Sequence, residues 1–295
     1  MNNKMQNFNY HTHTKRCRHA DLDLSDEDYV LEFLKKGFQV IAFTDHCPEK
    51  EVIDIRDNMR MVYSEKDEYL NSIKFLKNKY KNRISIKSGF EIEYLPGQEK
   101  NLLELRKDVD LMILGQHFVY DENKDLKIFR HQEFTNNDLF LYASYIEEAL
   151  KLGIVDIIAH PDIYMLSRDK FDDVCLEVAK RIGSAAEKYD IPLEINLCEI
   201  AIYLSRDDPS RIGGWKVNGF SYPNRDFWQV ISNYNVKVLY GIDAHYKSQI
   251  ELYEESISFA NKLIGKDVID KLNFCDFNFN AINKKDNKSY KMRNN

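Results

Sequence analysis

Short apolar runs alternate along the chain with longer stretches in which apolar residues recur every three or four positions. The short runs are rich in β-branched and aromatic residues, and several are nearly continuous, which is typical of strands buried on both faces. They are QNFNYH (6–11), 38–44, 84–92, 110–116, 154–160, 191–196 and 236–242. A strand followed by a helix, repeated about seven times, predicts a parallel α/β fold.

The longer stretches between these runs have the pattern of helices. Residues 25–37 begin with Ser25 and an acidic turn and end at Gly37, and both residues are common at helix ends. The other helical stretches are 64–80, 136–153, 172–189 and 248–265. Residues 199–226 are long for a link between a strand and a helix, and long loops of this kind often face substrate.

Composition limits the number of domains. The chain has 295 residues, of which 43% are hydrophobic, so it can bury one large core or two ordinary ones. No break in composition marks a linker, and we therefore expect one domain over residues 1–282. The polar segment 283–295 is expected to be a frayed tail.

The net charge limits the kinds of partner that the protein can bind, and the cysteines indicate its compartment. The net charge is −6 with acids and bases interspersed, which argues against a nucleic-acid scaffold but allows a small anionic substrate at a metal centre. Five cysteines without paired spacing favour a reducing compartment. No signal-peptide segment and no apolar run of membrane length is visible, so we expect a cytoplasmic protein without a membrane partner. The oligomeric state is not indicated.

Residues that can bind metal stand at the C-terminal ends of the predicted strands. In chain order they are His11, His13, His19, His46, Glu91, His117, His160, Asp243 and His245, and the sixth strand ends in Glu194 and Asn196. In a parallel barrel these ends open on one face, which carries the active site. A lone histidine at a strand end is usually an ordinary hydrogen-bonded residue. Here seven of the eight histidines share the pattern, with only His131 outside it, and this favours a metal site on that face.

The spacing indicates several ions. His11 and His13 are two apart on a strand, so their side chains share one face and can hold one ion, whereas His19 needs a loop to return and can serve another. Nine donors exceed the three or four that one ion typically takes when a position stays open. We predict two or three divalent ions bridged by Glu91. Imidazole with carboxylate favours Zn, Mn or Fe over Mg or Ca.

Other polar residues near these strand ends are expected to support the ligands. Asp45, Asp162 and Asn196 are predicted to hold the imidazoles in place. Cys17 and Cys47 each neighbour a predicted ligand. A thiolate ligand is one interpretation, but we favour two small buried residues, because the nitrogen and oxygen donors already form a complete set.

Taken together, the motifs resemble the PHP (polymerase and histidinol phosphatase) superfamily from about residue 8 to residue 265. The motifs are HTH (11–13), TDH (44–46), GFE (89–91), QHF (116–118), AHPD (159–162) and GIDAH (241–245). The resemblance implies a distorted seven-stranded (β/α) barrel with a trinuclear metal site at the strand C-terminal face, and it gives all nine donors above a ligand role. Within the superfamily, segments 11–20 and 59–105 are most similar to histidinol-phosphate phosphatases.

This resemblance implies an enzyme, namely a metal-dependent phosphomonoesterase. The leading substrate is L-histidinol phosphate, hydrolysed to L-histidinol and phosphate in histidine biosynthesis. Asp243 and His245 are candidates for protonating the leaving group. Arg168, Arg60 and Arg206 lie on predicted loops of the metal face, where a guanidinium fork could bind phosphate. The loop 199–226 offers groups suited to an amine and an imidazole, namely Glu199, Asp207, Asp208, Trp215 and Tyr222.

Three alternatives stay open at this point. One is a PHP-type nuclease or phosphodiesterase, and the net charge of −6 counts against it. Another is a phosphatase of a different small phosphomonoester. The last is a metal-binding protein without catalytic activity, and the complete ligand set counts against it. We expect a small phosphorylated molecule as partner and no nucleic acid.

Overall fold

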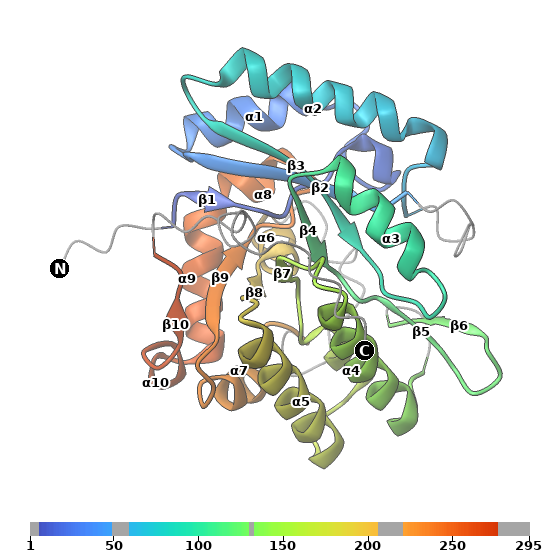
Figure 1. Cartoon of the computed structure of the whole chain (residues 1–295). Coiled ribbons are helices and arrows are strands. Elements are labelled where there is room, and N and C mark those ends of the chain that lie inside the picture. The colour runs from blue at the N-terminus through green and yellow to red at the C-terminus, as the bar shows by residue number, and fades with distance from the viewer. Residues whose placement is uncertain (1–5, 49–58, 130–132, 206–220, 277–295) are drawn as a thin grey trace.

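The computed structural model describes residues 6–48, 59–129, 133–205 and 221–276, and the structural statements below refer to these ranges. An eight-stranded, curled parallel sheet forms the centre of the fold, in the order β1-β2-β3-β4-β7-β8-β9-β10 (Figure 1). Its strands are β1 (Phe8–Asn9), β2 (Val40–His46), β3 (Ser85–Ile92), β4 (Leu111–Leu114), β7 (Ile157–Ile158), β8 (Leu193–Asn196), β9 (Lys237–Gly241) and β10 (Asn273–Phe274). The α/β prediction is confirmed.

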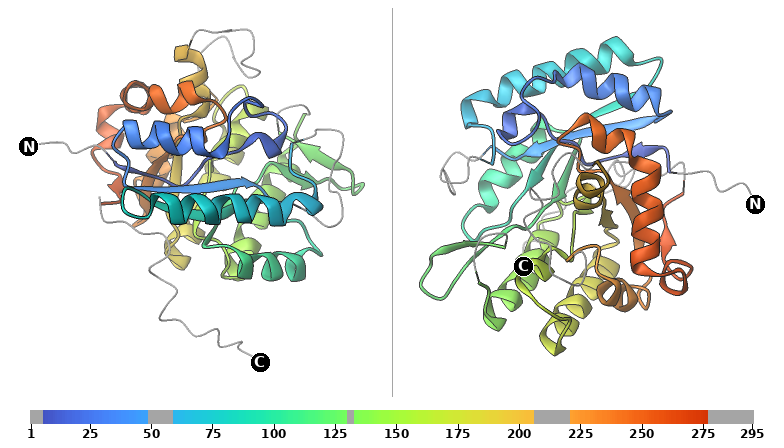
Figure 2. Two further views of the ribbon diagram at one scale, coloured as in Figure 1. Left: turned by 90° about the horizontal axis from the view of Figure 1, so that it is seen from above. Right: turned by 180° about the vertical axis from the view of Figure 1, so that it is seen from behind.

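The predicted number of strands is wrong by one. Each of the seven predicted runs contains a strand, but β10 adds an eighth beside the start of β9, with Asn273 opposite Lys237. This strand has only two residues and Asn273 is exposed, so no apolar run signals it. The chain also forms an antiparallel hairpin that was not predicted, made of β5 (Phe118–Tyr120) and β6 (Leu126–Ile128). The hairpin projects from the body of the molecule (Figures 1 and 2).

The helices lie outside the curled sheet (Figure 2). They are α1 (Asp26–Lys35), α2 (Lys66–Tyr80), α3 (Glu99–Leu105), α4 (Asn136–Lys151), α5 (Asp173–Tyr189), α6 (Cys198–Ser205), α7 (Arg225–Ile231), α8 (Lys247–Glu251), α9 (Tyr253–Ile264) and α10 (Lys266–Ile269). Ser25 caps α1 as predicted, because its side chain accepts from the backbone of Asp28 while the Asp28 side chain accepts from the backbone of Ser25. Thr135 and Asp138 form the same reciprocal cap on α4.

The predicted loop 199–226 is partly helical. Its first residues belong to α6, whose sequence CEIAIYLS contains no glycine or proline, and its last residues begin α7. Residues 206–220 lie outside the described ranges, as do His131 and the predicted tail 283–295. That residues 1–282 form a single domain stays a prediction. Among the described residues, no helix combines the length and the apolar character that crossing a membrane requires.

The two edges of the curl meet at the C-terminal ends of the strands. Thr12, beyond β1, forms a parallel bridge with Ala244, beyond β9, and the His13 amide donates to the Ala244 carbonyl at 2.9 Å. Earlier along the same two segments, the side-chain oxygen of Asn9 accepts from the Ile242 amide at 2.9 Å. The first and the last of the ligand-bearing segments therefore lie side by side.

An apolar plug fills the inside of the curl beneath these ends. It consists of Phe8, Tyr10, Ala42, Leu111, Ile113, Ile157, Ala159 and Leu239, all at most 1% exposed. Alternate residues of β4 point to the two faces, so Leu111 and Ile113 join this plug while Met112 and Leu114 pack against the helices. Because this apolar cluster fills the inside of the curled sheet, the polar side chains gather at the C-terminal ends of the strands.

Candidate metal centre

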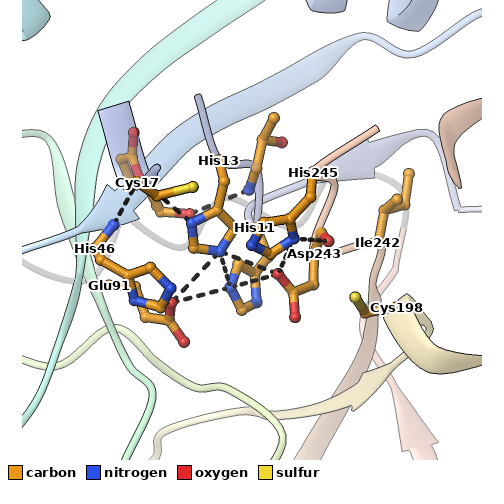
Figure 3. A network of polar contacts seen from close by, with 12 residues as sticks. His11, His13, Cys17, His46, Glu91, Cys198, Ile242, Asp243 and His245 are labelled. Carbon is orange, nitrogen blue, oxygen red and sulfur yellow. Dashed lines mark hydrogen bonds and ion pairs between the residues drawn. The ribbon is translucent and has the colours of Figure 1, made fainter. Parts of the chain in front are cut away.

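The structure brings all nine predicted donors together at the C-terminal end of the curled sheet. Figure 3 shows six of them, His11, His13, His46, Glu91, Asp243 and His245, turned toward one another. Groups of three, each offering one ligand atom within 4.8 Å of the other two, are His11–His13–Glu91, His46–Glu91–His117, His11–His160–Asp243, His19–His46–His245 and His13–Cys17–His245. Every predicted donor falls into at least one group. Their convergence is therefore a structural fact, whereas metal binding by them stays a prediction.

Glu91 lies at the centre of the cluster, at the end of β3, and is 2% exposed. Five imidazoles face its two carboxylate oxygens. The distances are 2.9 Å from Oε1 to His160 Nε2, 3.7 Å from Oε1 to His117 Nε2, 2.9 Å from Oε2 to His46 Nδ1, 3.4 Å from Oε2 to His13 Nε2 and 3.6 Å from Oε2 to His11 Nε2. A carboxylate surrounded in this way can be shared between two ions.

Asp243 is the second carboxylate of the cluster. Its Oδ1 lies 3.0 Å from His13 Nε2 and 3.4 Å from His11 Nε2. Asp243 and His160 also have positive φ angles, 52° and 29°, which non-glycine residues rarely adopt. Such strain concentrates at functional sites, where the surrounding structure holds the backbone in place.

Four imidazoles are oriented through their outer nitrogen. His11 Nδ1 lies 2.9 Å from Glu194 Oε1, and His117 Nδ1 lies 2.7 Å from Glu93 Oε1. His19 Nδ1 lies 2.8 Å from the Cys17 carbonyl, and His245 Nδ1 lies 3.0 Å from the Asp243 carbonyl. An Nδ1–H that donates to these acceptors leaves Nε2 unprotonated, as a metal ligand requires.

A chain of buried polar side chains supports His13. Asp45 Oδ1 lies 3.4 Å from His13 Nδ1, and the Thr14 hydroxyl donates to Asp45 Oδ2. Arg16, which is 6% exposed, donates from Nη1 to Thr14 Oγ1 at 3.1 Å and to Asp26 Oδ1 at 2.9 Å. Asp45 therefore lies beside the His13 imidazole, and its supporting role stays a prediction. The contacts of Thr14 and Arg16 were not predicted.

Asp162 and Asn196 have other contacts than predicted. Asp162 Oδ2 accepts from the Asn224 amide at 2.7 Å and from Trp228 Nε1 at 3.1 Å, so it holds the start of α7 and, within the described ranges, no imidazole. Asn196 Nδ2 donates to Glu194 Oε2 and to Asp243 Oδ2, both at 3.1 Å, and therefore holds carboxylates.

Glu93 and Glu194, which orient His117 and His11, were not predicted as partners. Their positions in the sequence place both carboxylates on the metal face, because Glu93 stands two residues beyond Glu91 and Glu194 lies near the end of the sixth predicted strand. What the sequence does not reveal is which imidazole each carboxylate reaches.

Two glycines make room for the buried carboxylates. A methyl group on Gly115, directly after β4, would overlap Glu91 Oε1, and one on Gly241, in β9, would overlap Glu194 Oε1. Both carboxylates thus lean across the backbone of the neighbouring strand, which only glycine permits here.

The electrostatics of the cluster are those of a site for cations. Burial alone would lower the pKa of His11, but Asp243, Glu194 and Glu91 outweigh burial and raise it to about 10. Burial alone would raise the pKa of Glu91, but the imidazoles of His46, His11 and others hold it well below its usual range. Burial and the imidazole of His13 lower the pKa of His245 well below its usual range.

Buried oxygens within the cluster also lack hydrogen-bond donors. Among the described residues, Glu91 Oε2 and Asp243 Oδ1 are buried without a hydrogen bond, which is costly unless a cation compensates. Mixed imidazole and carboxylate donors in closely spaced groups suit divalent transition-metal ions. The residues therefore fit the ions that the sequence predicts.

A cavity of about 450 Å³ opens directly on this cluster. Asp243 and His245 border it, as does Tyr222 of the predicted substrate loop. Glu199 is buried on α6 and is not among the lining residues, and Asp207, Asp208 and Trp215 lie outside the described ranges.

The predicted phosphate-binding arginines do not line the cavity where they are described. Arg168 donates from Nη2 to Asn136 Oδ1 at 2.7 Å. Arg60 lies over the Phe118 ring, with Nη2 4.0 Å from Glu93 Oε1. Arg206 lies outside the described ranges. Phosphate binding by any of the three stays a prediction.

Both weighed cysteines are fully buried. Cys47 packs in the apolar core, as expected of a small buried residue. Cys17 lies beside His13 and His245 in one of the donor groups, so its sulfur stands where a thiolate ligand would.

A Thr14→Val variant is expected to bind metal 10–100-fold more weakly than wild type, because outer partners of metal ligands typically contribute about this much. Valine keeps the shape but removes the hydroxyl that links Arg16 to Asp45. Competition with a chromophoric chelator measures the affinity. Thr135→Val, which removes the cap of α4 far along the chain, is the matched control. Equal metal affinity in Thr14→Val and wild type would contradict a supporting role for Thr14.

Comparisons with known proteins agree with this geometry. A model of the PHP domain family matches residues 9–197. A protein of Schizosaccharomyces pombe described as "Probable histidinol-phosphatase" is 26% identical over 273 residues, covering 85% of each chain. The histidinol-phosphatase of Bacillus subtilis is 29% identical over 151 residues, which are 48% of this chain and 55% of that protein.

A solved structure has the same fold. It is the histidinol phosphate phosphatase of Lactococcus lactis in complex with zinc, L-histidinol and phosphate. Its TM-score is 0.60 at 18% identity, and the match covers 86% of this chain and 94% of that one.

Proposed function

Since the chain belongs to the PHP domain family, we propose that it is a metal-dependent phosphomonoesterase that hydrolyses L-histidinol phosphate to L-histidinol and phosphate in histidine biosynthesis. The observation that carries the proposal is the convergence of nine donors, seven of them buried, at the base of a cavity, with Glu91 at their centre. Relatives described as histidinol-phosphatases, and the zinc, histidinol and phosphate bound by the Lactococcus enzyme, support this choice of substrate.

Two or three divalent ions, Zn, Mn or Fe, are the proposed cofactors. Glu91 would be shared between the group with His11 and His13 and the group with His46 and His117. The group His19–His46–His245 would hold a further ion. When bound, such ions neutralise phosphate charge and lower the pKa of water.

The side chains of the protein orient the metal donors and assist protonation of the leaving oxygen. Glu194 and Glu93 keep His11 and His117 turned toward the centre, so that the donors are arranged before substrate enters. Asp243 and His245 border the cavity, and we propose that they orient the water from which the leaving oxygen takes its proton. Arg168, Arg60 and Arg206 remain the proposed partners of the phosphate oxygens.

The proposed substrate can be tested directly with purified protein reconstituted with Mn or Zn. The kcat/KM for L-histidinol phosphate is expected to exceed that for p-nitrophenyl phosphate by well over tenfold, because contacts to the amine and imidazole contribute in the transition state. Phosphate release measures both reactions, and single-stranded DNA is the control substrate. Equal values for the two phosphomonoesters would reduce the proposal to a phosphatase of unknown substrate, and cleavage of DNA alone would favour the nuclease alternative.

A further inference from the structure

The backbone of His245 is held on both sides by groups from three other segments. Its amide donates to Oε1 of Gln249, in α8, at 2.6 Å. Its carbonyl accepts from the hydroxyl of Tyr29, on α1, at 2.6 Å and from the amide of Asp21, shortly after His19, at 3.0 Å. The position of His245 is therefore set by these segments together and not by β9 alone.

The contacts of Gln249 go beyond those of a helix cap. Gln249 is 1% exposed, and its Oε1 also accepts from the Tyr246 amide at 2.8 Å. A glutamine at the third position of a helix commonly makes that bond to the residue before the helix. Capping does not require the second bond to Oε1, from the His245 amide, or the bond from Nε2 to Cys198 Sγ at 3.1 Å.

The sulfur of Cys198 faces the nitrogen end of the Gln249 amide group. Cys198 begins α6, and its own amide donates at 2.9 Å to Oδ1 of Asn196, the last residue of β8. With Nε2 turned toward this sulfur, Oε1 faces the two backbone amides, and a carbonyl oxygen can accept from both. Gln249 thus joins the segment after β8 to the segment after β9.

The segment that Gln249 holds is strained. Asp243 has a φ of 52°, and a strained backbone persists only where the surrounding structure fixes it. The imidazole of His245 has Nδ1 3.0 Å from the Asp243 carbonyl and Nε2 2.8 Å from His19 Nε2. Because the imidazole side chain is short, a shift of the His245 backbone would move Nε2 with it.

We propose that Gln249 and Tyr29 are positioning residues, which hold the His245 imidazole where the group His19–His46–His245 can bind an ion. This inference rests on the metal centre of the proposed function. The imidazoles oriented by Glu194 and Glu93 belong to groups without His245, and those bonds do not involve the two positioning residues. Loss of Gln249 or Tyr29 should therefore weaken binding at His245 and leave the groups around Glu91 able to bind.

Titration of metal-free protein with Co²⁺ tests the proposal, because the visible absorption of Co²⁺ reports both the number of bound ions and the arrangement of their ligands. Competition with a chelator gives the affinity of each binding step. His245→Ala removes the ligand itself, and its titration identifies the step that belongs to this group.

Three variants change the contacts to different extents. Gln249→Met keeps the length of the side chain but removes the acceptor, and we expect it to weaken the His245 step 10–100-fold, as is typical for partners of metal ligands. Gln249→Glu keeps an acceptor for both amides and should bind within about threefold of wild type. Tyr29→Phe removes one of two donors to the His245 carbonyl, so we expect a loss of at most about tenfold.

Gln6→Met is the matched control. Gln6 also holds backbone through its side-chain amide, since Oε1 accepts from the Tyr240 amide at 3.0 Å and Nε2 donates to the Tyr240 carbonyl at 2.7 Å. It precedes β1, however, whereas the first donors follow that strand. We expect Gln6→Met to lower the melting temperature and to keep every Co²⁺ binding step and the absorption spectrum of wild type.

The outcomes separate this inference from the proposed function. Unchanged binding in Gln249→Met, an equal loss at every step, or an equal loss in Gln6→Met would overturn the positioning role. Binding in Gln249→Glu as weak as in Gln249→Met would also overturn it. If Gln249→Met does not fold, Tyr29→Phe decides, because a loss outside the His245 step, or no loss, contradicts the proposal. Wild-type protein that binds no Co²⁺ would overturn the metal centre and this inference with it. Binding as expected without hydrolysis of L-histidinol phosphate would support the positioning role and overturn only the proposed function.

Discussion

A Glu91→Gln variant is expected to lose about 10³-fold or more in phosphatase activity and to retain fewer metal ions than wild type. Glutamine has the same shape but no charge, and five imidazoles face this one carboxylate. Partners one step further out typically contribute 10–100-fold, so a central shared ligand should contribute more. Elemental analysis after gentle purification measures the ions, and more than one transition-metal ion per wild-type chain is expected.

The control for this variant is Glu104→Gln. Glu104 is exposed on α3, so the same chemical change there should leave both metal content and activity as in wild type. If Glu91→Gln kept its full complement of metal and its kcat, Glu91 could not be the residue that the ions share.

A Gly115→Ala variant is expected to lose about 100-fold in activity, although it adds only one methyl group. That methyl would overlap Glu91 Oε1, the oxygen that lies 2.9 Å from His160 Nε2. The carboxylate must then rotate away from its imidazoles, and a displacement of about 1 Å in a catalytic arrangement can cost 10²-fold. Gly115 has no positive φ, so the backbone itself accepts alanine.

The matched control is Gly153→Ala, in the turn after α4. Gly153 has a φ of 69° and open space where the methyl would stand, so alanine strains the backbone without touching a ligand. We expect this variant to have a lower melting temperature with unchanged kcat and metal content. Gly115→Ala should instead lower kcat and metal content more than it lowers the melting temperature. A Gly115→Ala protein with wild-type metal content would refute the overlap argument.

Much of the fold could be predicted from the sequence because its signals are local. A strand buried on both faces is a continuous apolar run, and the residue after it must lie at the same end of the sheet as its neighbours. That is why all nine donors could be placed on one face before any contact was known. β10 and the β5–β6 hairpin escaped prediction because they are two or three residues long and depend on pairing.

The parts of the site that could not be predicted depend on contacts between distant segments. Arg16 looks like a solvated loop residue in the sequence, yet it is buried between Asp26 and Glu68. The need for glycine at position 115 exists only because Glu91 leans over from the neighbouring strand. Burial and register decide both roles, and neither leaves a periodic trace along the chain.

The seam between Thr12 and Ala244 has a consequence for the order of events during synthesis. His11 and His13 emerge from the ribosome well before Asp243 and His245, which complete two of their groups. Domains generally begin to fold from the N-terminus while the rest of the chain is still being made. A nascent chain that ends before β9 contains the groups His46–Glu91–His117 and His11–His13–Glu91, but it lacks every group that needs Asp243 or His245. Full occupancy by metal would therefore require that synthesis has passed β9 and His245, and a chain released before that point would lack the seam and the ligands beyond it.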